Sequence, residues 1–135
     1  MIVFDVSTLI GAALKADSVP ERALLRAAQF DKLALSTEVH GELVGVLNRP
    51  HLAPKITSVR RDFVLGIVYR IANWIEPTVR VEDCRDAKDD KYLELALAAN
   101  AGTIVSSDND LLVLNPWRGV RIPLPSEYLA LVEMD

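Results

Sequence analysis

The chain has 135 residues, half of them hydrophobic and a quarter charged, which is the composition of one globular domain and excludes a disordered or collagen-like chain. Its single cysteine, Cys84, excludes an intrachain disulfide and a four-cysteine zinc site. The net charge of −4 argues against a purely electrostatic nucleic-acid binder. We therefore expect a single domain over residues 1–135.

Short apolar runs alternate with longer amphipathic segments in the first half of the chain. The pattern predicts strands over Ile2–Phe4 and Leu33–Leu35, and helices over Thr8–Ala16, Pro20–Phe30, Ser36–Leu47 and Ser58–Ile75. The serines that begin the third and fourth helices are good N-caps, and a proline follows soon after the end of each.

The same alternation continues in the second half. Strands are predicted over Val79–Val81, Thr103–Val105 and Val120–Ile122, and helices over Lys88–Ala101, around Leu111 and from Pro125 onwards. Gly102 is the expected C-cap of the helix before it. Apolar strands that alternate with helices indicate a three-layer α/β/α sandwich with a mostly parallel central sheet of four to five strands.

Acidic residues follow two of these strands. Asp5 comes directly after the first strand and Asp108 lies shortly after Thr103–Val105. Ligands of parallel sheets bind outside the carboxyl ends of the strands, so both carboxylates are expected there. Helical periodicity adds Glu42, at the edge of the apolar stripe of its helix, and Asp89, near the inward side of another. Asp90, one residue further on, remains an alternative to Asp89.

Four clustered carboxylates in a partly buried pocket repel one another, and a hard divalent cation removes that penalty. Mg²⁺ and Mn²⁺ prefer oxygen ligands and activate bound water, which is the chemistry of a hydrolytic nuclease. A basic flank that includes Arg49, Arg60 and Arg61 could guide RNA phosphates or form a solvated face.

Four segments in order resemble the motifs of the PIN domain family. Residues 5–10 resemble its opening Asp-Thr-Asn/Ser-x-Leu-Ile, and residues 42–50 its Glu-Leu followed by a hydrophobic pair and Arg-Pro. Residues 85–96 resemble Arg-Asp-Pro-x-Asp-Asp/Asn-x-Phe-Leu-Glu-Leu-Ala, and residues 104–112 resemble Val-Thr-Gly-Asp-x-Asp-Leu-Leu. The resemblance continues to residues 122–129 and covers nearly the whole chain.

The resemblance implies a Mg²⁺- or Mn²⁺-dependent endoribonuclease with Asp5, Glu42, Asp89 and Asp108 as its catalytic and metal-binding acids. It implies that Asp5 and Asp89 hold the main metal, while Asp108 and Glu42 complete this site or a second one. The order and spacing fit the toxin components of bacterial toxin–antitoxin systems, which are relatives of the VapC ribonucleases. The implied partners are RNA, a cognate antitoxin and a second copy of the chain.

The motifs depart from the family pattern at three positions. Ser7 replaces a frequent Asn, Ala87 replaces a frequent Pro, and Ser107 replaces a frequent Gly. The resemblance implies that the hydroxyls of Ser7 and Ser106 orient the acids or bound water. All four acids are retained.

Two other functions remain open. A receiver-like phosphoacceptor domain would also bind Mg²⁺ in an acidic pocket, but it requires paired acids after the first strand, where Asp5 stands alone. A PIN fold that binds RNA or protein without turnover is the second alternative. We also expect a cytoplasmic protein without a membrane span, because no apolar run approaches roughly 18 to 20 residues and the start lacks a signal peptide.

Overall fold

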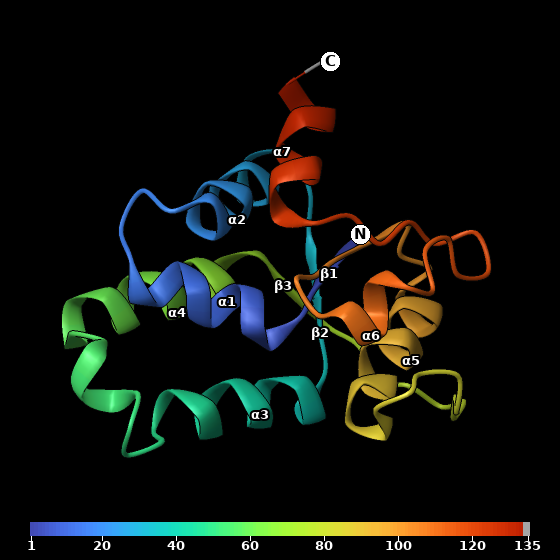
Figure 1. The fold of residues 1–135 in the computed structure, drawn as a ribbon, viewed down its shortest axis with the longest axis horizontal. Coiled ribbons are helices and arrows are strands. Elements are labelled where there is room, and N and C mark those ends of the chain that lie inside the picture. The colour runs from blue at the N-terminus through green and yellow to red at the C-terminus, as the bar shows by residue number, and fades with distance from the viewer. Residues whose placement is uncertain (134–135) are drawn as a thin grey trace.

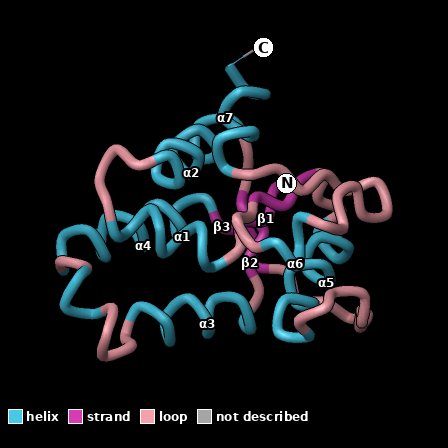
Figure 2. Tube along the Cα trace, in the orientation of Figure 1, coloured by secondary structure: helices cyan, strands magenta, loops and turns pink. Residues whose placement is uncertain are grey.

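The computed structural model describes residues 1–133, and Figures 1 and 2 show short strands at the centre with helices around them. Residues 134 and 135 of the predicted domain lie outside the described part. The strands are β1 (Ile2–Phe4), β2 (Leu33–Leu35), β3 (Ala72–Trp74) and β4 (Thr103–Val105). The helices are α1 (Val6–Leu14), α2 (Val19–Phe30), α3 (Thr37–Leu47), α4 (Ser58–Ile71), α5 (Asp90–Ala99), α6 (Asn109–Leu112) and α7 (Pro125–Glu133), with 3-10 turns at Ala53–Lys55 and Ala87–Asp89.

The four strands form one parallel sheet in the order β3-β2-β1-β4. Figure 1 shows α1, α2 and α4 on one side of the sheet, with α5 and α6 on the other. Helix α5 contacts β1, β2 and β4, while α1 packs against α2, α3 and α4. This arrangement confirms the predicted three-layer α/β/α sandwich.

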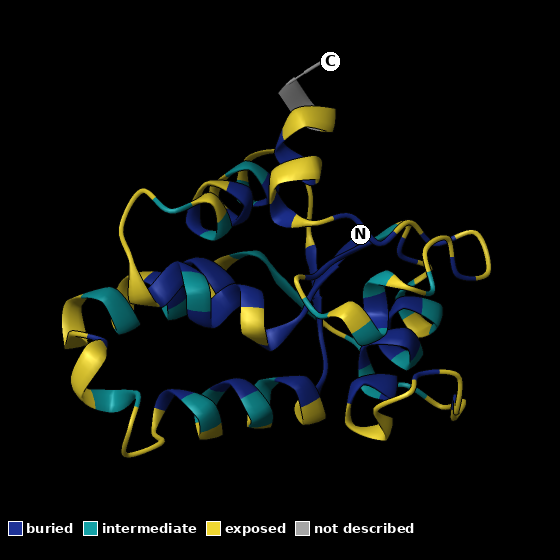
Figure 3. Ribbon diagram, viewed as in Figure 1, coloured by how far each residue is buried: buried dark blue, intermediate teal, exposed yellow. Residues whose placement is uncertain are grey.

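The core lies around the sheet, where β1 and β2 are buried at every position. Figure 3 shows this burial as a dark centre, with the exposed residues on the outer faces of the helices. Parallel strands covered on both faces need apolar side chains at consecutive positions, and Ile2–Phe4 and Leu33–Leu35 meet that requirement. No helix among residues 1–133 is long and apolar enough to cross a membrane.

Side-chain caps fix where several helices begin. Ser36 caps α3 as predicted, and its hydroxyl accepts the Val39 N–H at 3.2 Å. Helix α4 is capped by Thr57 and not by Ser58. Helix α5 ends two residues earlier than predicted because Asn100 adopts a left-handed conformation at φ 51°, so Gly102 is not its cap.

The prediction of the third strand at Val79–Val81 is wrong, because β3 is Ala72–Trp74 and follows α4 without a turn. β3 pairs with β2 in the register Leu33↔Ala72, so its strand conformation depends on a distant partner. It lies at the edge of the sheet, which leaves Trp74 53% exposed.

The predicted fifth strand at Val120–Ile122 is only partly formed. Arg121 makes an isolated parallel bridge with Thr103, so the segment lies beside β4 without becoming a full strand. The N–H of Ile104 donates to the Arg121 carbonyl at 2.8 Å, and the N–H of Ser106 donates to the Pro123 carbonyl at 3.1 Å. These bonds cover the β4 edge of the sheet.

Candidate active site

The register of β1 and β4 brings two functional side chains together at the carboxyl edge of the sheet. Phe4 pairs with Val105, so the next residues, Asp5 and Ser106, leave the sheet side by side. The Ser106 hydroxyl donates a hydrogen bond to Oδ2 of Asp5. Oδ1 of Asp5 accepts the Thr8 N–H at 2.9 Å, so the same carboxylate caps α1.

Ser106 also positions the next acid. Its Oγ accepts the N–H of Asp108 at 2.9 Å, which links the turn after β4 to the Asp5 carboxylate. Asp108 caps the short helix α6, where its Oδ1 accepts the Asp110 N–H at 2.9 Å. Ser106 is fully buried, whereas Asp108 is half-buried. Ser106 therefore connects two of the predicted acids, in agreement with the orienting role implied for it.

Asp89 lies against Asp108, whereas Asp90 faces away. The Asp90 carboxylate accepts the Cys84 N–H at 2.9 Å and so holds the preceding loop. Oδ2 of Asp89 is buried and has no hydrogen-bond partner among the described residues. Carboxylate oxygens of Asp86, Asp89 and Asp110 also come within 4.8 Å of one another. Among the described residues, this group includes Asp89 and not the alternative Asp90, and it does not include Asp5 or Asp108.

Burial perturbs the acid–base behaviour of two of these carboxylates. Burial raises the pKa of Asp5, although Ser106 and Thr8 donate hydrogen bonds that favour its ionised form. Burial also raises the pKa of Asp89 to about 7, with further increases from the neighbouring carboxyls of Asp108 and Asp86. Both acids are therefore costly to ionise without a cation nearby.

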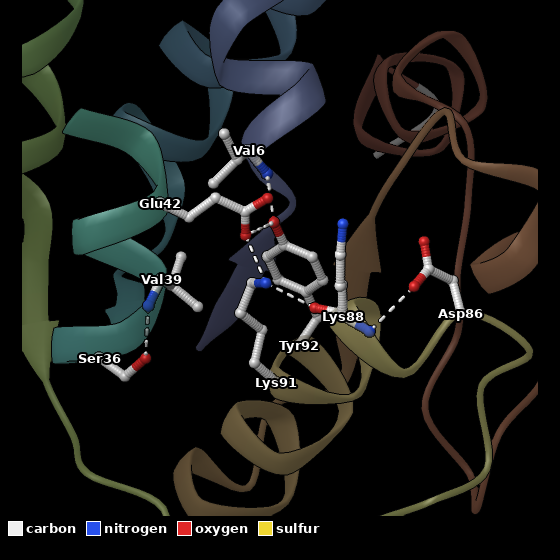
Figure 4. A network of polar contacts seen from close by, with 8 residues as sticks. All are labelled: Val6, Ser36, Val39, Glu42, Asp86, Lys88, Lys91 and Tyr92. Carbon is white, nitrogen blue, oxygen red and sulfur yellow. Dashed lines mark hydrogen bonds and ion pairs between the residues drawn. The ribbon is translucent and has the colours of Figure 1, made fainter. Parts of the chain in front are cut away.

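Glu42 lies at the other side of the site and has different partners, shown in Figure 4. Its Oε2 accepts a hydrogen bond from the Tyr92 hydroxyl at 3.0 Å and forms an ion pair with Lys91. The Tyr92 hydroxyl in turn accepts the Val6 N–H at 3.1 Å, next to Asp5 in the sequence. Burial and the charges of Glu42 and Asp5 raise the pKa of Tyr92, so its hydroxyl remains a donor.

Sequence reasoning missed four residues of this site: Asp86, Asp110, Lys91 and Tyr92. A signal existed for Tyr92, which stands where the resembling motif has Phe and thus adds a hydroxyl. Asp86 and Asp110 stand at aspartates of the resembling motifs, whereas Lys91 carries no local signal, because a charged residue in a first helical turn usually faces solvent.

A cleft of about 320 Å³ borders the site between α1 and α3 and is lined by Ser7, Ile10, Gly11, Glu42, Val46 and Arg49. Of the three arginines considered for RNA, only Arg49 lines this cleft. Arg60 instead forms an ion pair with the buried Glu21 and donates to the Ala12 carbonyl at 2.7 Å. Arg61 donates to the Leu47 carbonyl at 3.2 Å. These last two arginines hold helices together.

The donor set suits a hard divalent cation. Asp5, Asp89 and Asp108 offer only carboxylate oxygens, the ligands that Mg²⁺ and Mn²⁺ prefer. The buried Oδ2 of Asp89 has no hydrogen-bond donor among the described residues, although a buried carboxylate oxygen normally has a donor or a metal. This oxygen therefore supports a metal at Asp89. Within the described part of the chain, no ion pair joins these three acids to a lysine or arginine.

Comparisons with known proteins agree with this architecture. A family model described as PIN domain matches residues 1–110. The crystal structure of PAE2754 from Pyrobaculum aerophilum superposes with a TM-score of 0.63 at 17% identity, over 98% of this chain and 89% of that chain. VapBC2 from Rickettsia felis, bound to a DNA fragment from their promoter, gives a TM-score of 0.54 at 15% identity, over 90% of this chain and 97% of that chain. No curated protein matches.

Proposed function

The chain belongs to the PIN domain family, and from that premise we propose that it is a Mg²⁺- or Mn²⁺-dependent endoribonuclease. The substrate is RNA, and the reaction is hydrolysis of a phosphodiester bond. One observation carries the proposal: the buried, unpartnered oxygen of Asp89 beside Asp108, at the sheet edge where Asp5 also emerges. Carboxylates this close together repel a polyanionic substrate unless a cation is bound between them.

A divalent ion bound by Asp5, Asp89 and Asp108 would supply an activated water and neutralise charge on the phosphate. The chain's own residues then have distinct tasks. Ser106 holds the Asp5 carboxylate and the Asp108 backbone in one arrangement, and Arg49 in the adjacent cleft provides a cation for a substrate phosphate. Glu42 lines this cleft, and the Tyr92 hydroxyl holds its carboxylate in place.

We propose further that the protein is the toxin of a type II toxin–antitoxin system, with a cognate antitoxin and a second copy of the chain as partners in the cytoplasm. The motif order along the chain supports this role, and so does the similarity in fold to VapBC2. The receiver-like alternative loses its support, because residues 1–110 match the PIN model. A PIN fold without turnover remains the competing function, and it predicts RNA binding without cleavage.

Digestion of a mixed set of RNA oligonucleotides tests the proposed activity. The purified protein is expected to cut RNA with Mn²⁺ and to stop with EDTA, and Asp5→Asn and Asp89→Asn should each abolish cutting. Asp62→Asn is the matched control, because this exposed carboxylate on α4 lies outside the site. Cutting that persists in EDTA or in Asp89→Asn would contradict the proposal, and metal-dependent RNA binding without cutting would favour the silent fold.

The proposed toxin role needs a separate measurement. Induced expression of the wild type should arrest bacterial growth, whereas Asp5→Asn should not, and co-expression of a small protein encoded beside the gene should restore growth. Light scattering after size-exclusion chromatography tests the proposed dimer by its mass. Growth arrest by the Asp5→Asn variant would show that toxicity does not arise from the acidic site.

A further inference from the structure

Glu42 differs from the other three acids because it already has a cation. The Lys91 ammonium forms an ion pair with Oε2 of Glu42 and also donates to the Lys88 carbonyl (Figure 4). The Lys91 side chain is only 10% exposed, so its charge is held inside the protein. The Tyr92 hydroxyl donates to the same carboxylate oxygen. Two donors from consecutive residues of α5 therefore fix Glu42.

Asp5, Asp89 and Asp108 have no such partner. Asp5 is stabilised by a hydroxyl and a backbone N–H, Asp108 accepts a backbone N–H, and Asp89 has a buried oxygen without any donor among the described residues. Among the described residues, Glu42 is the one of these four acids that forms an ion pair with a lysine or arginine. The Lys91 charge also lowers the pKa of Asp89, but burial and the neighbouring carboxyls of Asp108 and Asp86 outweigh it.

We propose that Lys91 is the resident counter-cation of Glu42, so that the chain binds one divalent cation through Asp5, Asp89 and Asp108. Glu42 is then a positioning residue and not a metal ligand. This inference rests on the proposed metal site and departs from a site in which all four acids bind metal.

The electrostatic reason is repulsion between like charges. A second divalent cation bound to Oε2 of Glu42 would lie within a few ångströms of the Lys91 ammonium, and the two positive charges would repel. The ammonium cannot easily withdraw, because its side chain is buried and it is also bound to the Lys88 carbonyl. Tyr92 adds a third constraint, since a metal bound at Oε2 of Glu42 would compete with its hydroxyl.

Counting bound Mn²⁺ tests this inference without measuring activity. The electron paramagnetic resonance signal of free Mn²⁺ gives the number of ions bound per chain and their affinity. The wild type is expected to bind one Mn²⁺. Asp89→Asn should weaken binding by about tenfold or more, whereas Glu42→Gln should change the affinity by no more than about threefold.

Lys91→Met provides the sharper result. Without the ammonium, Glu42 becomes an uncompensated carboxylate, so this variant should bind a second Mn²⁺, and the double variant Lys91→Met, Glu42→Gln should return to one. Lys88→Met is the matched control, because it removes a nearby exposed charge that does not contact Glu42 and should leave one Mn²⁺ bound. Lys91→Gln serves as a second variant if the methionine variant does not fold, as judged by circular dichroism.

The outcomes separate this inference from the proposed function. Two Mn²⁺ ions in the wild type, or equal losses in Glu42→Gln and Asp89→Asn, would overturn the role of Lys91 while the metal site stands. A Lys91→Met variant that is folded but still binds one Mn²⁺ would also overturn it. No Mn²⁺ binding by the wild type would overturn the metal site itself.

Discussion

Replacement of Asp89 by asparagine should stabilise the metal-free protein at neutral and alkaline pH, although it removes an acid of the candidate active site. Burial and then the neighbouring Asp108 raise the pKa of Asp89 from 3.8 to about 7. Because the folded pKa lies above the unfolded one, the penalty for ionisation is absent below about pH 4. It grows as the pH rises between the two pKa values and is constant above about pH 7.

The size of this effect follows from the shift. A rise of about three pKa units corresponds to at most about 4 kcal/mol of unfolding free energy, at ~1.4 kcal/mol per unit. Asp108 is half-buried, so water screens part of the repulsion, and we expect a gain of about 1 to 2 kcal/mol for Asp89→Asn near pH 8. The new amide can donate a hydrogen bond to Asp108, which a second carboxylate cannot do.

Urea unfolding in EDTA at about pH 8 and about pH 4 measures this difference. The gain in unfolding free energy of Asp89→Asn should be present at the higher pH and absent at the lower one. Asp62→Asn, at an exposed position on α4, should show no gain at either pH. Added Mn²⁺ should stabilise the wild type and not Asp89→Asn, because only a native state with an intact site gains binding free energy. A variant that is less stable than the wild type at the higher pH, or equally changed at both, would refute the reasoning.

Three further predictions concern stability and exposure. Glu21→Gln should lower the unfolding free energy by about 3 kcal/mol in urea titrations, because it leaves the Arg60 guanidinium without its buried partner; a loss below about 1 kcal/mol would show that this pair behaves like a surface ion pair. Tyr92→Phe should cost about 1 to 3 kcal/mol, because the buried Val6 N–H loses its acceptor, and unchanged stability would contradict that bond. Trp74→Phe should make the remaining tryptophan fluorescence resistant to acrylamide, since Trp74 is 53% exposed and the other indole only 6%; strong quenching in this variant would contradict the placement of Trp74.

The sequence predicted most of the sheet, because its strands are apolar runs that are buried on both faces. Ile2–Phe4, Leu33–Leu35 and Thr103–Val105 match β1, β2 and β4 at their exact bounds. β3 could not be found in this way, since Ala72–Trp74 has no apolar pattern and its strand conformation comes from pairing with β2. A local reading therefore extended α4 through it and moved the strand to Val79–Val81.

The candidate site, like the sheet, could be predicted from the sequence only in part. Asp5 and Asp108 could be placed because they follow adjacent strands, and the register of a parallel pair carries both to the same edge. Glu42 could be placed only near that edge, because its partners lie on α5 and depend on how two helices pack. Helical periodicity could not predict the ion pair between Lys91 and Glu42, since a lysine in a first helical turn normally faces solvent.

The start of α5 shows why a shift of one residue would change the site. Four consecutive side chains, Asp89 to Tyr92, point in directions about 100° apart, and each has a separate task. Asp89 faces Asp108, Asp90 holds the Cys84 loop, and Lys91 and Tyr92 hold Glu42.

The rotation of this turn is set by bonds at its beginning. Oδ1 of Asp86 accepts the Lys88 N–H at 3.0 Å, and the Asp90 carboxylate accepts the Cys84 N–H at 2.9 Å. If α5 turned by one residue, Asp90 would replace Asp89 beside Asp108, and Lys91 would leave Glu42 without its cation. The cap of the 3-10 turn before α5 and the bond from the first residue of α5 therefore determine which acid lies beside Asp108 and which acid pairs with Lys91. Asp86 and Asp90 thus shape the site from positions that need not bind metal.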